Sequence, residues 1–224
     1  MKKSILACVG SVLLSMLSPA LAADMPIKGA PGPYLAPYYN WTGFYIGING
    51  GYAFGKSKWT DPAAAITTGS FNVNGPVAGG TLGYNYQTGA IVWGIEGDYD
   101  WSNIKGSTTT NCVGGCETKN SWLGTARFRL GYAFDRWLPF VTGGAAFGDI
   151  KATSMGGSTT KTKVGWTAGA GIEWAFFSNW TAKVEYLYVD LGNGSCSGAC
   201  AGGGGPIDVK FQTSLVRAGI NYRF

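Results

Sequence analysis

The chain has 224 residues and a formal net charge of +5, from 17 Lys and Arg against 12 Asp and Glu, and it contains no His. The absence of His removes the commonest general base and the commonest metal ligand, so we predict no catalytic residue, no metal site and no cofactor. The basic residues form no cluster that would indicate nucleic-acid binding. With 37 Gly, 12 Tyr, 11 Phe and 9 Trp, the composition favours strands and turns.

Residues 1–22 have the layout of a secretory signal peptide. Two lysines at the start precede the apolar run Ile5–Leu17 and the small-x-small cleavage site Ala20–Ala22. The apolar run is shorter than the roughly 20 residues that a membrane helix needs. We therefore expect residues 1–22 to be removed, and the proline-rich residues 23–40 to form an extended lead-in at the periplasmic side.

From Trp41 onward, eight segments alternate between apolar and polar residues with the period of two that is typical of a β-strand. They are residues 42–55, 76–87, 91–103, 121–134, 137–150, 162–176, 180–192 and 209–224. The fifth segment is ambiguous, and we assign Val141, Gly143, Ala145 and Phe147 to its outward face. Each segment exceeds the roughly 9–11 residues that a tilted strand needs to cross a membrane.

The connectors between these segments alternate in length. Long connectors are predicted at residues 56–75, 104–120, 151–161 and 193–208, and short ones at 88–90, 135–136 and 177–179. Long loops at one end and tight turns at the other are the layout of an outer-membrane barrel, in which the long loops lie outside the cell. An even number of strands places both ends of the barrel at the periplasmic rim.

The outward aromatic residues form two bands. A periplasmic band comprises Phe44, Tyr84, Tyr86, Trp93, Tyr132, Phe134, Trp174, Phe176, Trp180, Tyr222 and Phe224, and an outer band comprises Tyr52, Tyr99, Trp101, Trp122, Phe147, Trp166, Tyr186 and Tyr188. Aromatic rings prefer the two interfaces of a bilayer. The alternative is that they are ordinary core aromatics of a soluble sandwich. We predict an all-β fold, an eight-stranded antiparallel up-and-down transmembrane β-barrel over residues 41–224.

Charged residues of both signs fall on the inward face of the predicted strands. We name as a lumenal charge network Glu96, Asp98, Arg127, Arg129, Glu173, Lys183, Glu185 and Arg217, and the same face carries Asp100 and Arg223. Isolated charges in a narrow interior are costly, whereas paired ones are tolerated. One interpretation is a salt-bridged plug. The others are a narrow, gated ion path and acid–base catalysis by paired carboxylates, for which no substrate cleft is indicated.

Four cysteines remain after the predicted signal peptide, in two pairs with the spacing Cys-x3-Cys. An even number of cysteines in a secreted chain favours disulfides. We therefore predict the local bridges Cys112–Cys116 and Cys196–Cys200, each of which would stiffen one connector. The alternative is a four-thiolate zinc site.

Several segments resemble small bacterial outer-membrane β-barrel proteins of the porin or opacity type, which are related in architecture to the OmpA transmembrane domain. The similar segments are Asn40–Gly55, Arg127–Tyr132, Val184–Asp190 and Val216–Phe224. The resemblance implies location in the bacterial outer membrane. It also implies that Phe224, at the end of the last strand, is part of the signal that the outer-membrane assembly machinery reads.

The resemblance implies no particular activity, so three functions remain open. The first is a structural, non-enzymatic barrel that supports the envelope and displays extracellular loops. The second is a small porin-like channel for ions or small solutes. The third is an adhesion or interaction protein whose stiffened loops bind an extracellular ligand. The expected partners are outer-membrane lipid and the assembly machinery.

Overall fold

The structure is a computed structural model that describes residues 39–61, 66–111, 115–154, 157–196 and 207–224. The predicted signal peptide, residues 1–22, and nearly all of the predicted lead-in, residues 23–40, lie outside these ranges. Among the described residues, no helix is long and apolar enough to cross a membrane.

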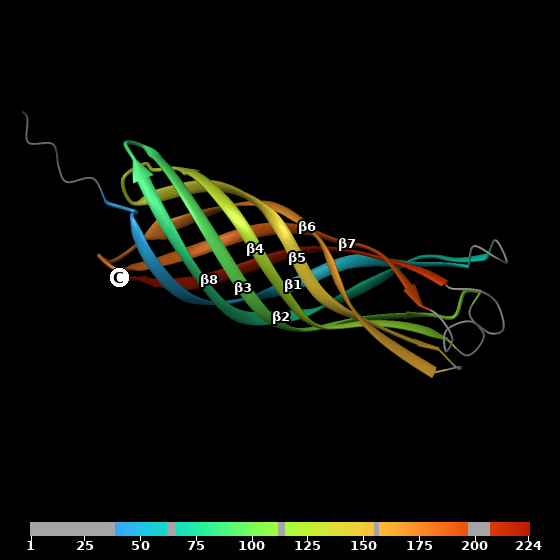
Figure 1. The fold of residues 1–224 in the computed structure, drawn as a ribbon. Coiled ribbons are helices and arrows are strands. Elements are labelled where there is room, and N and C mark those ends of the chain that lie inside the picture. Colours follow the sequence, from blue (N-terminus) through green and yellow to red (C-terminus); the bar gives the residue numbers. More distant parts are fainter. Residues whose placement is uncertain (1–38, 62–65, 112–114, 155–156, 197–206) are drawn as a thin grey trace, which may run out of the picture. The chain divides into compact units, whose positions relative to one another are not determined.

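Eight antiparallel strands form one closed ring (Figure 1). The strands are β1 Gly43–Asp61, β2 Ile66–Thr88, β3 Ile91–Thr108, β4 Cys116–Tyr132, β5 Trp137–Ser154, β6 Gly157–Ala175, β7 Trp180–Cys196 and β8 Ile207–Arg223. Each strand pairs with its neighbours in chain order, and β1 pairs with β8 from Tyr45–Arg223 to Thr60–Asp208. The predicted eight-stranded antiparallel barrel is confirmed.

Three tight turns join strands at the end of the barrel where β8 finishes (Figure 1). The β2–β3 turn contains Gly89 at φ +62°, and the β4–β5 turn contains Asp135 at φ +52°. Both values lie in the left-handed region that Gly, Asn and Asp adopt most readily. These turns lie at the short connectors predicted at residues 88–90, 135–136 and 177–179.

The prediction of long loops at the opposite end is wrong. The connectors predicted at residues 56–75, 104–120, 151–161 and 193–208 are mostly paired strand, because β1 continues to Asp61 and β2 already begins at Ile66. The other three pairs extend in the same way, so four long hairpins continue the barrel beyond the predicted membrane segments (Figure 1).

The inward residues of these hairpin extensions explain why they are strands. Large apolar side chains there are buried inside the ring: Trp59, Val73, Ile104, Ile150 and Phe211. Their outward neighbours are mostly Ser, Thr, Asn and Lys, since this part of the wall faces water rather than lipid. The composition of these segments is therefore typical of polar loops, although their residues alternate with period two like the rest of the barrel.

The outward wall between the hairpins and the tight turns is apolar. Phe128 is 75% exposed and Ile48 71% exposed, as expected for side chains that contact lipid. The two aromatic bands flank this region: Tyr99 stacks on Trp122 with ring centroids 5.9 Å apart, and Trp137 stacks on Trp174 at 5.5 Å. The fifth strand follows the predicted assignment, with Val141 exposed opposite Leu130.

The apolar wall predicts a depth-dependent effect of charge. Phe128→Arg, midway between the two bands, should destabilise the barrel by about 2–4 kcal/mol, because it places a guanidinium in hydrocarbon. Ser107→Arg, an outward position on the β3 extension, should change stability by less than about 0.5 kcal/mol. Urea unfolding in phosphatidylcholine vesicles measures both. Equal losses would show that the wall around Phe128 does not face lipid.

Candidate functional site

The interior of the barrel is divided into three layers. At the tight-turn end, Trp41, Val92, Leu138 and Ala175 form a small buried apolar cluster. The middle layer holds the charged residues. The hairpin end holds a larger apolar cluster, which we call the hairpin core: Ala53, Trp59, Val73, Val77, Ile104, Cys116, Leu123, Ala146, Ile150, Ala152, Leu187, Val189, Leu191, Val209, Phe211 and Leu215. The charged layer is therefore covered by apolar side chains on both sides.

Trp41 closes the tight-turn end. Its indole N–H donates to the carbonyl oxygen of Asp135 at 3.0 Å, and its backbone N–H donates to Gln87 at 2.7 Å. The neighbouring Tyr39 ring lies under the guanidinium of Arg223, 4.4 Å from the ring centroid. Burial raises the pKa of the Tyr39 phenol, while the positive charge of Arg223 acts in the opposite direction. Arg223 is thus a rim residue rather than part of the central layer.

Arg127 on β4 lies at the centre of the charged layer. Its guanidinium contacts Glu96 and Asp98 on β3, the latter at 2.6 Å, and reaches Glu185 on β7 at 3.0 Å. Each of these side chains is at most 1% exposed. One arginine therefore joins adjacent strands and also crosses the lumen.

Arg217 on β8 makes a second set of contacts across the lumen. It lies 2.9 Å from Asp98, 2.6 Å from Asp100 and 2.8 Å from Glu185. Lys183 extends this set, with its ammonium 2.8 Å from Glu96 and 3.2 Å from Glu185. The two residues link β7 and β8 to β3 on the far side of the ring.

Arg129 and Glu173 form the side of the network nearest the tight turns. They pair directly, and Arg129 lies 3.6 Å from Glu96 and 3.7 Å above the centroid of the Phe140 ring. Glu173 also accepts hydrogen bonds from Thr181 and, at 2.9 Å, from the amide of Asn221. The structure thus brings all eight residues named from the sequence into one connected set, together with Asp100.

Neutral residues that the sequence analysis did not single out complete the network. The Tyr45 hydroxyl donates to Glu96 at 2.7 Å, and Thr81 and Thr125 donate to the two oxygens of Asp98 at 2.8 and 2.7 Å. The available signal was the alternation along each strand, which places these side chains on the inward face. Inward Thr, however, is too common in barrels to be distinctive. The Tyr45 ring fits because Gly83 lacks a side chain: a Cβ there would lie 2.3 Å from the ring.

Three carboxylates of the network are close enough to suggest a cation site. Ligand oxygens of Glu96, Asp98 and Glu185 lie within 4.8 Å of one another. The guanidinium of Arg127 contacts all three, so it occupies the position that a metal ion would take. We therefore read this group as part of the ion-paired network.

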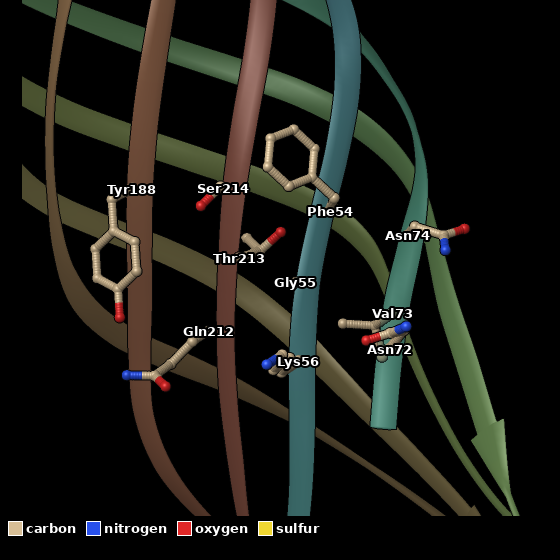
Figure 2. Close-up of a pocket in the computed structure, with 10 residues that line it drawn as sticks. All are labelled: Phe54, Gly55, Lys56, Asn72, Val73, Asn74, Tyr188, Gln212, Thr213 and Ser214. Carbon is tan, nitrogen blue, oxygen red and sulfur yellow. The ribbon is translucent and has the colours of Figure 1, made fainter. Parts of the chain in front are cut away.

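A groove of about 450 Å³ lies on the outside of the barrel, where the hairpins leave the outer band. Figure 2 shows that its residues come from four adjacent strands, β7, β8, β1 and β2. They are Phe54, Gly55, Lys56, Asn72, Val73, Asn74, Tyr188, Gln212, Thr213 and Ser214. Gln212 is held by a 2.7 Å hydrogen bond to Asp190, and Asn74 accepts one from Tyr52 at 3.1 Å. We call this feature the outer groove.

The remaining predicted site residues are only partly described. Cys116 is buried at the start of β4 and is disulfide-bonded. Cys112, Cys200 and the side chain of Cys196 lie outside the described residues, so the two predicted pairings remain predictions. Phe224 is 74% exposed, and its backbone N–H donates to Phe44 at 3.0 Å, which continues the β1–β8 pairing.

The network predicts a large loss of stability on removal of its central cation. Arg127→Met should lower the free energy of unfolding by about 3–5 kcal/mol, because it leaves three buried carboxylates without their shared partner. Arg223→Met, at the rim, should cost no more than about 1 kcal/mol. Urea unfolding in vesicles compares the two variants, and similar small losses would contradict a central role for Arg127.

The cysteine pairs predict two local disulfides in the exported protein. Alkylation without reductant should leave the mass unchanged, and alkylation after reduction should modify four thiols. Peptide mapping should then recover Cys112 with Cys116 and Cys196 with Cys200. Four thiols that react before reduction would contradict the prediction.

Comparisons with known proteins agree with this geometry. The family model described as outer membrane protein beta-barrel domain matches residues 10–224. The chain is 38% identical to the 31 kDa outer-membrane immunogenic protein of Brucella melitensis over 248 residues, which cover 100% of both chains. It is 35% identical to the 25 kDa outer-membrane immunogenic protein of Brucella abortus over 98% of this chain and 97% of the relative.

Among solved structures, the chain is similar in fold to the outer membrane protein OprG from Pseudomonas aeruginosa. The TM-score is 0.51 at 12% identity, over 83% of this chain and 98% of that one. This likeness concerns the fold alone. The family match and the two relatives show that the chain belongs to the outer membrane protein beta-barrel family and is an outer-membrane protein.

Proposed function

We propose that this protein is a structural, non-conducting barrel that supports the outer membrane and displays four hairpins at the cell surface. The observation that carries the proposal is the burial of the charged layer. Every side chain in its ion pairs is at most 4% exposed. Apolar clusters cover this layer on both sides.

The ion pairs themselves oppose conduction. A conducting pore needs sites that bind an ion weakly enough to release it. Here Arg127 and Arg217 each contact three carboxylates, so an entering ion would have to separate buried charges. Breaking a buried pair costs several kcal/mol. The interior is thus better suited to hold the barrel together than to pass solutes.

The same contacts argue against catalysis. The chain has no His, and the carboxylates of the charged layer are engaged with Arg or Lys and shielded from water. A general acid or base must reach a substrate. We therefore include in the proposal that the barrel is not an enzyme.

The hairpins support the display part of the proposal. They extend as paired strands beyond the outer band and carry polar residues outward, as a surface in contact with water requires. The names of the two Brucella relatives describe them as immunogenic outer-membrane proteins. A surface-exposed position of the hairpins here would be consistent with that description. The partners of this function are outer-membrane lipid along the apolar wall and the assembly machinery at Phe224.

The proposal predicts electrical silence in planar lipid bilayers. The folded protein should show no stable single-channel openings, since the charged layer is buried between two apolar clusters. A shift in gel mobility between heated and unheated samples checks that the reconstituted barrel is folded. Stable openings whose conductance changes in Arg127→Gln or Glu96→Gln would overturn the proposal and favour the channel alternative.

A further inference from the structure

Three lysines form a row on the outer wall of the hairpin extensions. Lys105 on β3 lies directly opposite Lys119 on β4, and Lys119 lies directly opposite Lys151 on β5. Their chain neighbours Ile104, Thr118, Asn120, Ile150 and Ala152 are buried inside the ring. Because side chains alternate along a strand, the three lysines point outward. We call this set the lysine row.

The arrangement is unfavourable without a counter-charge. Directly opposed residues in an antiparallel pair have Cβ atoms about 4.5–5.5 Å apart, and like charges at this position destabilise a sheet. The ion pairs among the described residues all lie inside the barrel, and none includes a lysine of the row. The outward Glu117 lies opposite Ser107 and Thr153, and it forms no ion pair with a lysine of the row either.

The same feature occurs a second time on β1 and β8, two residues beyond Lys56 and Gln212 of the outer groove. Lys58 on β1 and Lys210 on β8 are directly opposed, exposed and without an ion pair to a described residue. On β6, by contrast, the outward position opposite Lys151 is Thr160. Opposed positive charges therefore lie on β3 to β5 and on β8 to β1, and the outer groove adjoins both sets.

The lysine row is continuous with the outer groove. Tyr188, Ser214, Phe54, Asn74 and Lys105 are successive cross-strand partners from β7 to β3. Figure 2 shows the first four of these residues lining the groove. Aromatic rings and side-chain amides thus adjoin the row of ammonium groups on one surface.

The height of the row places it just outside the hydrocarbon layer. Each lysine lies three or four residues beyond an aromatic of the outer band on its own strand, namely Trp101, Trp122 and Phe147. This distance is about 10–13 Å along the strand, or about 8–10 Å above the band at a strand tilt of about 40°. Lipid headgroups occupy this level.

We propose that the lysine row binds the phosphate groups on the sugar headgroup of an outer-leaflet glycolipid, with the sugars extending into the outer groove. Adjacent strands lie about 4.8 Å apart, so the row spans about 10 Å and matches a headgroup with more than one phosphate. A single phosphodiester could neutralise only part of it. Bound phosphate would turn a repulsive row into a favourable one. The inference rests on the outer-membrane location and is independent of whether the lumen conducts.

The test uses the full-length protein in phosphatidylcholine nanodiscs that contain bisphosphorylated lipid A. The variant K105Q/K119Q removes two lysines of the row. The matched control K161Q/K163Q removes two lysines at a similar height on β6, where they face inward opposite Ile150 and Gly148. Native mass spectrometry should find at least tenfold less lipid A bound to K105Q/K119Q and no more than a twofold change in the control. The conservative variant K105R/K119R should retain binding.

Stability provides a second readout that distinguishes a ligand site from a merely structural role. K105Q/K119Q should unfold at a higher urea concentration than the wild type in pure phosphatidylcholine, because it relieves repulsion. With lipid A present the order should reverse, because only the wild type gains from binding. The variant K105Q/K119Q and the control K161Q/K163Q must both show the heat-dependent gel shift of a folded barrel.

Three results would overturn the proposal. The first is equal lipid A binding by K105Q/K119Q and the wild type. The second is equal binding of lipid A whose phosphates have been removed. The third is displacement of lipid A by phosphatidylglycerol at the same concentration, which would show that no multiply phosphorylated headgroup is required.

Discussion

The constraint on which this structure depends is that lipid offers no hydrogen bonds to the backbone. Every N–H and C=O within the bilayer must be paired inside the protein, so the sheet has to close. The β1–β8 pairing provides that closure from Tyr45 to Thr60. A ring of eight strands leaves an interior that only side chains can fill. Closure therefore requires the inward residues to pack against one another, and polar ones to find partners there.

The charged layer satisfies this requirement and also opposes errors in strand register. Arg127 joins β4 to β3 and β7, and Arg217 joins β8 to β3 and β7. A buried salt bridge is weak evidence for stability when compared with an apolar core. A one-residue slip in strand register, however, would point these side chains toward the lipid. This would cost about 2–4 kcal/mol for each Arg or Lys near the bilayer centre. The network thus penalises incorrect pairings more than it stabilises the correct one.

The sequence predicts the barrel well where one face of each strand meets lipid. Residues such as Phe44, Ile46 and Ile48 alternate with small or polar ones so strongly that period two is unmistakable. The hairpin extensions were missed because Trp59 and Phe211 alternate with Ser, Thr and Lys, a composition typical of loops. The alternation of β8 predicts that Arg217 points inward. It does not predict the contact of Arg217 with Asp100, which lies 117 residues away in the chain. Such contacts across the lumen depend on strand tilt and stagger, which no local pattern specifies.

The two halves of the barrel invert the distribution of apolar residues. Within the membrane, Phe128 faces lipid and Arg127 faces the interior, whereas in the extensions Lys119 faces outward and the neighbouring Thr118 contacts the buried indole of Trp59 at 2.9 Å. In each half the apolar side chains lie where water is excluded, which is the lipid-facing wall below and the hairpin core above. The reversal therefore marks the outer membrane boundary without reference to the aromatic rings. It lies at the level of Leu123 and Leu215, and the lysine row follows directly beyond it, where positive charge is free to meet the headgroups.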